Sequence, residues 1–546
     1  MPGLQEMLHR AIGPRTSAWV AAEAVRLWLE TPRDRGERVA EVLAIDPTTV
    51  TISVVWETIC GSRTDLLDRV LDRHPRGRFV EAGVRWVPGW PLHTERWLPR
   101  QHAAFVALQE RVIADTGAQV WQRAGAIQAA ARTGDPGREL VLRQVDAPEV
   151  VIAEAALGAL AWTGRPDEAM PVLLRYADGD RARVALYAAG RAARYVAPSR
   201  LPALLGGVLA VPSKITSRKS AIRILARYGP APVMATLLEA YANPDAHRDV
   251  RAAIVAAARE RLDAEPSWTI LEGAVTGSRE ENRAVLAADP YLIAERHRAR
   301  YALLIVAACR GADREIRRAA FTRLPHWSRW AVDITGLIVD RLTDLGEQLG
   351  VIEAAQLLRA LGDAEVGAAL GRLIERDAAD DRPGGPAADR PARRRVDVLA
   401  RGAVTWSRTR PVGTAPPGLV AAARWLAGQP GYARTAAETL VGLGRLGNLD
   451  EIADLCAGRP ALAVRIAERV GARLRELPES IDPAILRGTV VRLAARGDLA
   501  GGLFAVALVR PGATFGWSAP WRELLLGLRR HPDADVRDEA YTVDMS

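Results

Sequence analysis

Cysteine is scarce in this chain of 546 residues. The three cysteines, Cys60, Cys309 and Cys456, lie far apart, and none belongs to a CxxC motif or a cluster with histidine. A disulfide framework needs cysteines that pair, and a structural zinc site needs closely spaced Cys or His ligands. The sequence therefore argues against both, and it favours a reducing compartment, the cytoplasm.

Long hydrophobic runs are also missing. The most apolar short run, Tyr301 to Cys309, is far shorter than the roughly 20 residues that a membrane-spanning helix needs. The first residues, MPGLQEMLHRAIG, lack the apolar stretch of a signal peptide. We therefore expect a soluble cytoplasmic protein that does not bind a membrane.

Motifs of catalysis are not found. The sequence has no GxxxxGK[ST] phosphate loop, no GxGxxG after a strand, no HExxH and no GxSxG. The eight histidines are scattered, and His93 and His102, nine residues apart without a nearby cysteine, are only a weak metal signal. We therefore predict that the protein is not an enzyme and that it uses no cofactor and no metal.

Lysine is nearly absent, since Lys214 and Lys219 are the only two. The net charge is nevertheless +9 and the isoelectric point about 9.9, because arginine supplies almost all of the positive charge. An excess of basic residues is typical of proteins that bind nucleic acid. However, the arginines are spread along the whole chain beside many Asp and Glu residues, and a GC-rich coding bias produces the same skew. Charge alone therefore leaves nucleic-acid binding as an alternative.

What the chain has in abundance is alanine and leucine at helical spacing. From residue 101 onward, apolar residues recur every three and four positions, and turns rich in Pro, Gly and Asp interrupt them every 12–18 residues. Such turns occur at 133–136, 163–166, 228–230 and 243–245. No strand pattern stands out. This part of the chain is therefore predicted to be all-α.

A second pattern recurs with a longer period. Several predicted helices carry an acidic or polar start followed by Val-Arg-x-x-Ala, as in Asp249 to Ile254. The arginines of successive copies are Arg183, Arg218, Arg251, Arg283 and Arg317, in steps of 35, 33, 32 and 34 residues. Arg123 and Ile152 hold the same place upstream. A sustained period of this size indicates stacked helical repeats.

The Asp-x-x-Val-Arg-x-x-Ala element at this period resembles HEAT repeats, in particular the short HEAT-like repeats of bacteria. The resemblance covers residues 101–546 and has its best register at 118–360. It implies an all-α fold, an α-solenoid of paired antiparallel helices in a superhelical array. It also implies a structural role for the repeated arginine, whose stem packs between helices while its head bonds an acidic residue or helix-end carbonyls of an adjacent repeat.

We expect four segments. Residues 1–100 form a divergent helical N-terminal cap that includes a Trp-rich loop at 73–100, and residues 101–377 form a HEAT-like arm. The segment 378–392, rich in Pro, Gly and Asp, is a linker or loop. Residues 393–546 form a second, C-terminal HEAT-like arm.

The Trp-rich loop has two interpretations. A loop of this length without regular structure is often functional, and Trp and Arg are favoured anchors at interfaces. In this interpretation the loop is a partner-binding edge, and its candidate contacts are Trp86, Trp90, Trp97, Arg85 and Arg96. In the other, the aromatic residues cover the open end of the solenoid, because a terminal repeat must hide its exposed face.

Residues 213–227 form the strongest local basic feature. Ser213 is predicted to cap a helix on which positions 219, 223 and 227, four residues apart, share the exposed face. A basic ridge of this kind can bind phosphate groups. The candidate contacts to phosphate or nucleic acid are Lys214, Lys219, Arg223 and Arg227. The alternative is a solvated outer face without a ligand.

The leading hypothesis for function is a non-catalytic scaffold or adaptor that binds a protein of unknown identity. The alternative is a nucleic-acid-binding solenoid that uses the basic ridge. Some HEAT-like proteins with a similar period are DNA glycosylases for alkylated bases, but their functional residues cannot be matched to positions in this chain. Arginines gathered on one stripe would favour nucleic acid, whereas mixed charges with an exposed Trp-rich loop would favour a protein.

Overall fold

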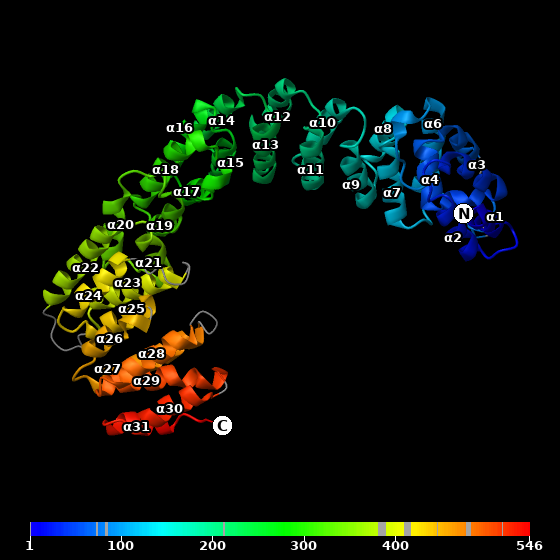
Figure 1. The fold of residues 1–546 in the computed structure, drawn as a ribbon. Coiled ribbons are helices and arrows are strands. Elements are labelled where there is room, and N and C mark those ends of the chain that lie inside the picture. The colour runs from blue at the N-terminus through cyan, green and yellow to red at the C-terminus, as the bar shows by residue number, and fades with distance from the viewer. Residues whose placement is uncertain are drawn as a thin grey trace. The chain divides into compact units, whose positions relative to one another are not determined.

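The computed structural model describes residues 2–72, 75–81, 84, 86–210, 213–380, 389–408, 417–444, 446–476, 482–515 and 517–545. Within these ranges the regular elements are helices, and none is a strand. The helices form two compact units, Met1–Ala284 (unit 1) and Val285–Ser546 (unit 2), labelled along the chain in Figure 1. Most of the predicted linker, at 381–388, lies outside the described residues. No helix in the described part is long and apolar enough to cross a membrane.

Unit 1 starts with a group of short helices and continues as a regular array. The first group is α1 (Pro2–Ile12), α2 (Ala18–Trp28), α3 (Arg35–Ile45), α4 (Ser53–Gly61) and α5 (Leu67–Leu71). The array is α6 (Pro99–Ala114), α7 (Val120–Ala130), α8 (Gly134–Gln144), α9 (Val150–Leu160), α10 (Pro166–Arg175), α11 (Ala182–Ala192), α12 (Leu201–Ala210), α13 (Ile215–Tyr228), α14 (Val233–Ala242), α15 (Arg248–Glu260) and α16 (Glu265–Val275). The division between the units falls inside α17 (Arg279–Leu286).

The array of unit 1 has two layers. The first layer consists of α6, α8, α10, α12, α14 and α16, and the second of α7, α9, α11, α13 and α15. Each even-numbered helix from α6 to α14 packs on the odd-numbered helix that follows it, and each second-layer helix also packs on the next one in its layer. Helices that contact only their neighbours in this way make a solenoid, because the core grows in one direction. The predicted α-solenoid of paired helices is therefore confirmed.

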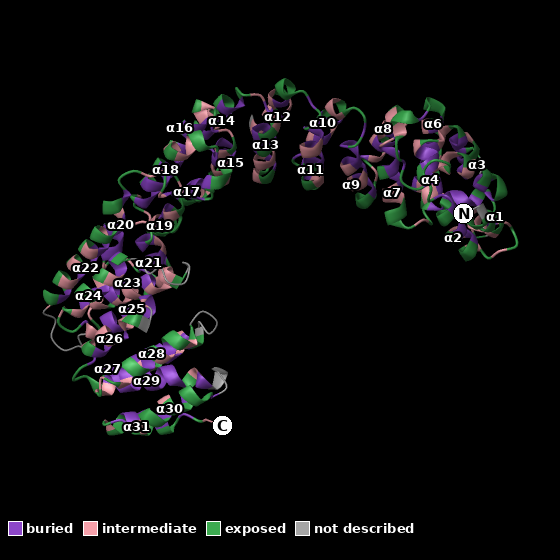
Figure 2. Ribbon diagram, viewed as in Figure 1, coloured by how far each residue is buried: buried purple, intermediate pink, exposed green. Residues whose placement is uncertain are grey.

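Helix α15 illustrates why these segments are helical. The His247 ring accepts a hydrogen bond from the Asp249 amide at the start of the helix. The buried residues are spaced at three and four along one face, and they are Val250, Ile254, Val255, Ala257 and Ala258. An apolar stripe of this kind is stable only against another helix. Figure 2 shows the same alternation of buried and exposed faces along both units.

The N-terminal helices of unit 1 enclose an aromatic core. Trp56 of α4 lies at its centre, with ring centroids of Trp86 at 5.9 Å, Trp97 at 6.2 Å and Phe105 at 6.4 Å. Aromatic rings at these separations attract one another and bury a large area. Segments before and after the Trp-rich loop are therefore joined in one core.

Unit 2 repeats the two-layer arrangement. Its helices are α18 (Glu295–Cys309), α19 (Arg314–Trp327), α20 (Ile334–Thr343), α21 (Val351–Leu358), α22 (Asp363–Ala378), α23 (Pro391–Arg408), α24 (Pro417–Ala427), α25 (Ala433–Leu443), α26 (Leu449–Leu455), α27 (Pro460–Glu476), α28 (Pro483–Ala494), α29 (Leu499–Val509), α30 (Ala519–Leu528) and α31 (Ala534–Tyr541). The odd-numbered helices from α19 to α31 pack in succession as the second layer, and α20, α22 and α24 pack in succession in the first. Helix α29 is buried from Ala500 to Val509 and forms the centre of the C-terminal core.

The repeated arginine has the predicted structural role in several repeats. Arg123 donates from Nε to the Ile113 carbonyl at 2.9 Å and from Nη1 to Glu149 at 2.8 Å. Arg317 donates to the Gly311 carbonyl at 2.8 Å and to Glu347 at 2.5 Å. In each case one guanidinium bonds a helix-end carbonyl and an acidic residue further along the array. The prediction is confirmed at these two positions.

At Arg183 the same prediction was wrong. Arg183 is exposed, and the contact to a preceding repeat is made instead by Arg181, which donates to the Val145 carbonyl at 3.1 Å. The period alone does not distinguish two arginines that are two residues apart. Arg181 is the N-cap residue of α11 and Arg183 lies in its first turn, and this difference decides which one reaches back to the earlier repeat.

All three cysteine thiols are buried and free. Burial raises the pKa of Cys60 and of Cys309 to about 12 and that of Cys456 to about 11, because a thiolate loses its hydration inside the protein. Cys60 lies in unit 1 and the other two in unit 2. The thiols are therefore protonated and unreactive in the native fold.

Candidate partner-binding surfaces

The Trp-rich loop lies largely against the N-terminal core. Trp97 is 6% exposed, and its indole Nε1 donates to the Cys60 carbonyl at 3.1 Å. Trp86 is half-buried against Trp56, whereas Trp90 is 44% exposed. Arg96 is exposed and donates to the Gly61 carbonyl at 2.6 Å, and Arg85 lies outside the described residues. Of the predicted contacts, Trp90 and Arg96 therefore present most surface to a partner.

The predicted basic ridge lies on α13 of unit 1. Arg223 and Arg227 are exposed, and Lys219 is half-buried on the same face. Among the described residues, none of these three forms an ion pair with a carboxylate. The ridge is therefore a row of three cations without internal neutralisation.

The two residues before the helix depart from the prediction. Lys214 is held away from the ridge, because its Nζ donates to the Gly179 carbonyl at 3.1 Å and its amide to Asp178 at 3.1 Å. Ser213 does not cap α13: its hydroxyl donates to the Val208 carbonyl at 2.7 Å, and the cap residue is Lys214. The serine faces the preceding helix because α12 ends only three residues earlier.

A row of alternating arginines and aromatic rings crosses the second layer of unit 1. The Arg132 guanidinium lies 4.6 Å from the ring of Trp90 and 4.8 Å from that of Trp162. The Arg191 guanidinium lies 5.3 Å from the ring of Trp162 and 4.5 Å from that of Tyr187. These five side chains, which we call the aromatic–arginine row, link the Trp-rich loop, the end of α7, the end of α9 and α11. Each contact is a cation–π interaction of about 0.5–1 kcal/mol at an exposed site.

A second group of arginine–tyrosine contacts lies beside the ridge. Arg194 donates from Nε to the Tyr228 hydroxyl at 3.1 Å, and the Arg227 guanidinium lies 5.5 Å from the same ring. Because Arg227 also belongs to the ridge, this contact lies at the C-terminal end of α13. The second layer of unit 1 thus presents rings and cations both in the row and beside the ridge.

Sequence reasoning missed the row, although a signal for it exists. The residues that follow the C-caps of α7, α9 and α11 are Arg132, Trp162 and Arg194, in the triplets Ala-Arg-Thr, Ala-Trp-Thr and Ala-Arg-Tyr. Aligning the repeats on their helix ends places Arg132 and Trp162, two members of the row, in register with Arg194. The arginine period instead aligns the repeats near their helix starts, where this register is not apparent.

Several arginines elsewhere in the array of unit 1 are paired with carboxylates. Ion pairs connect one repeat to the next on the side of the first layer, at Arg143–Glu110 (2.7 Å), Arg165–Asp135 (3.0 Å) and Arg200–Asp167 (2.9 Å). By contrast, within the described part of the chain, Arg132, Arg191 and the three ridge cations have no carboxylate partner. The second layer of unit 1 therefore carries a group of at least five cations that no carboxylate of the described residues neutralises.

The N-terminal ends of the same second-layer helices carry exposed apolar side chains. Trp121 at the start of α7 is 68% exposed, and Val150 and Val151 at the start of α9 are exposed beside it in the layer. Exposed rings and aliphatic groups close to arginines have the composition of the central part of protein interfaces.

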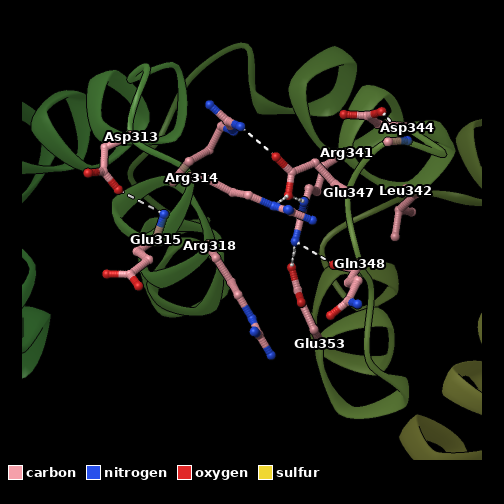
Figure 3. A network of polar contacts seen from close by, with 12 residues as sticks. Asp313, Arg314, Glu315, Arg318, Arg341, Leu342, Asp344, Glu347, Gln348 and Glu353 are labelled. Atoms are coloured by element: carbon pink, nitrogen blue, oxygen red, sulfur yellow. Dashed lines mark hydrogen bonds and ion pairs between the residues drawn. The ribbon is translucent and has the colours of Figure 1, made fainter.

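In unit 2 the most extensive polar network is internal and structural (Figure 3). Arg341 is buried and donates to Glu353 at 2.7 Å and to the Gln348 carbonyl at 3.0 Å, while Glu347 lies 3.4 Å away. Hydrogen bonds from Arg317 and Arg314 hold the pKa of Glu347 at about 2, below its ordinary 4.5. A lowered carboxyl pKa contributes stability above about pH 4.5 that is lost as the pH falls toward 2.

Unit 2 also has a cleft of about 480 Å³ along its second layer, between α23, α25 and α27. Among the described residues, six arginines line it together with the carboxylates Asp397 and Glu438, so the formal charge of this described lining is +4. We call it the arginine cleft, and its arginines are Arg401, Arg408, Arg434, Arg465, Arg469 and Arg473. A neighbouring cavity of about 580 Å³ shares Arg434 and Arg465 and adds Arg459.

No group of three or more His, Cys, Asp or Glu side chains among the described residues is placed to hold a metal ion. The weak signal at His93 and His102 is therefore not supported by geometry, since His102 Nε2 is hydrogen-bonded to the Thr94 carbonyl at 2.9 Å.

No protein-family model matches the chain, and no curated protein matches it. Among solved structures it is similar to Kap121p, with 11% identity over 99% of this chain and 69% of that one and a TM-score of 0.35. It is also similar to importin beta, with 12% identity over 98% of this chain and 78% of that one and a TM-score of 0.30. Likeness at this level says nothing about a partner. The helical-repeat architecture rests on the chain's own packing.

Proposed function

We propose that the chain is a non-catalytic scaffold that binds a protein partner on the second layer of unit 1. The observation that carries the proposal is the aromatic–arginine row. Trp162 is 45% exposed and Tyr187 67% exposed, and each ring is held by a guanidinium that has no internal carboxylate among the described residues. Trp, Tyr and Arg dominate the energetics of protein interfaces, and side chains already held in place lose little entropy on binding.

The row also indicates the chemistry of the partner. Its arginines can pair with carboxylates, and its rings, together with Trp121 and the valines of α9, can cover apolar side chains. A protein segment that alternates acidic and apolar residues satisfies both. The first-layer side of unit 1, where arginines and carboxylates already pair, offers no comparable set.

We expect the double variant W162A/Y187A to lose its protein partner. Truncation of interface anchors typically costs 2 kcal/mol or more, which corresponds to a drop in affinity of more than about tenfold. The measurement is quantitative affinity purification from the native host after nuclease treatment. W19A is the matched control, because Trp19 is an exposed tryptophan on α2 outside the row. Equal recovery of every protein with W162A/Y187A and W19A would contradict the proposal.

A second candidate function is nucleic-acid binding on the ridge of α13. It is favoured by one observation, the three cations spaced four residues apart that lack carboxylate partners in the described part of the chain. The triple variant K219Q/R223Q/R227Q should weaken binding to a labelled oligonucleotide and lower the salt dependence by about 0.7 for each lost phosphate contact. The control is R143Q/R165Q/R200Q, which removes the same charge from paired positions. Binding that responds equally to both variants would rule out the ridge.

A further inference from the structure

The described lining of the arginine cleft of unit 2 holds more arginines than carboxylates. Arg465 pairs with Glu438 at 2.6 Å, while Arg434 is 3.9 Å from Asp397. The Asp397 carboxylate already accepts a hydrogen bond from the Thr435 hydroxyl at 2.6 Å. Both carboxylates of the described lining are therefore already engaged, by Arg434, Thr435 and Arg465.

Two exposed arginines of the lining have no carboxylate partner among the described residues. Arg401 donates only to the Asp397 backbone carbonyl, at 3.2 Å, and Arg469 has no ion pair. They extend from α23 and α27, on two sides of the cleft. An exposed guanidinium that lines a cleft and lacks a carboxylate partner is free to bind an anion from solution.

The arginines of the cleft follow a line and do not surround a single position. Arg465, Arg469 and Arg473 are four residues apart on α27, so their backbones span about 12 Å along the helix axis. The adjoining cavity continues the line through Arg434 and Arg465 to Arg459, and its lining contains no carboxylate. This line of arginines in the cleft therefore matches a ligand that carries several anionic groups one after another better than a ligand with a single anionic group.

We propose that the arginine cleft binds the phosphate backbone of a single-stranded nucleic acid. Guanidinium groups pair with phosphate oxygens in bidentate geometry, and a strand presents phosphates at regular intervals. No aromatic side chain lines the cleft among the described residues, so base stacking contributes nothing there, and recognition is independent of sequence. The site is separate from the protein-binding row of unit 1, and neither proposal depends on the other.

The test compares two double variants of the full chain. R401Q/R469Q removes the two arginines that lack carboxylate partners, and R372Q/R424Q removes two exposed arginines paired with Asp340 and Glu451 in the first layer. Both lose the same charge. Binding of a fluorescein-labelled oligothymidine is followed by anisotropy at about 50 mM and about 200 mM salt. Each measurement is repeated in the K219Q/R223Q/R227Q background, so that the ridge does not contribute.

We expect R401Q/R469Q to weaken binding about tenfold at the lower salt and to reduce the slope of log K against log salt by about 1.4, with R372Q/R424Q close to the unaltered chain. Salt-independent binding, or an equal effect of the two variants, overturns the proposal. Inorganic tripolyphosphate is a second probe. If it binds in an Arg401- and Arg469-dependent way while oligothymidine does not bind, the cleft takes a free phosphorylated ligand and the nucleic-acid proposal is wrong.

Discussion

Replacement of Trp97 by alanine should lower the free energy of unfolding by about 3–5 kcal/mol. Trp97 is nearly fully buried, packs edge-on against Trp56 and Phe105, and donates its indole hydrogen to the Cys60 carbonyl. Alanine would leave a cavity between α4 and α6 and an unpaired backbone carbonyl. Urea unfolding followed by circular dichroism measures the loss.

W90A is the matched control for this prediction. Trp90 belongs to the same loop but is 44% exposed, so its truncation should cost about 1 kcal/mol or less. A similar small loss for W97A would mean that the loop does not complete the N-terminal core. A large loss for W97A would support the interpretation in which the aromatic residues of the loop cover the open end of the solenoid.

Removal of Arg341 should destabilise the chain to a comparable extent. R341A leaves Glu353 buried without its partner, whereas Glu347 keeps its bonds to Arg314 and Arg317. Breaking a buried pair on one side costs about 3–5 kcal/mol. R318A is the control, since Arg318 is exposed in the same region and makes none of these contacts (Figure 3). Thermal and urea unfolding of both variants give the comparison.

A second variant separates charge from packing. In R341M/E353M both partners become apolar side chains of similar length, and such replacements are often neutral or stabilising. We therefore expect the double variant to be more stable than R341A. Equal instability of the two would indicate that the network's hydrogen bonds, including the one to the Gln348 carbonyl, hold the turn between α20 and α21.

The repeat and its fold were predictable because they depend on local periodicity. Ala and Leu at three- and four-residue spacing define each helix, and the arginine period defines how helices stack, as the contacts of Arg123 and Arg317 confirm. What the period could not give was the exact residue in each repeat, because Arg181 rather than Arg183 reaches the preceding turn. A contact across a turn depends on backbone path, which composition does not record.

The candidate surfaces were only partly predictable. The tryptophans of the loop at 73–100 are visible in the sequence, but that Trp97 packs into the core is not. Only the structure shows that Arg132 lies against both Trp90 and Trp162. Likewise the charge of the chain was visible in the sequence, but its distribution was not. Whether an arginine is neutralised depends on whether a carboxylate about 30 residues away in the chain lies beside it, as Asp135 lies beside Arg165.

The buried thiols give the chain its own reporters of local opening. Each unit contains at least one cysteine that is protonated and shielded while its surroundings are folded, with Cys60 in the N-terminal core, Cys309 at the end of α18 and Cys456 beside α26. In a solenoid, neighbouring repeats can open without the whole array unfolding. The alkylation rate of each thiol can be followed by mass spectrometry. It therefore measures the free energy of local opening at three separate positions in the chain, and no label has to be introduced.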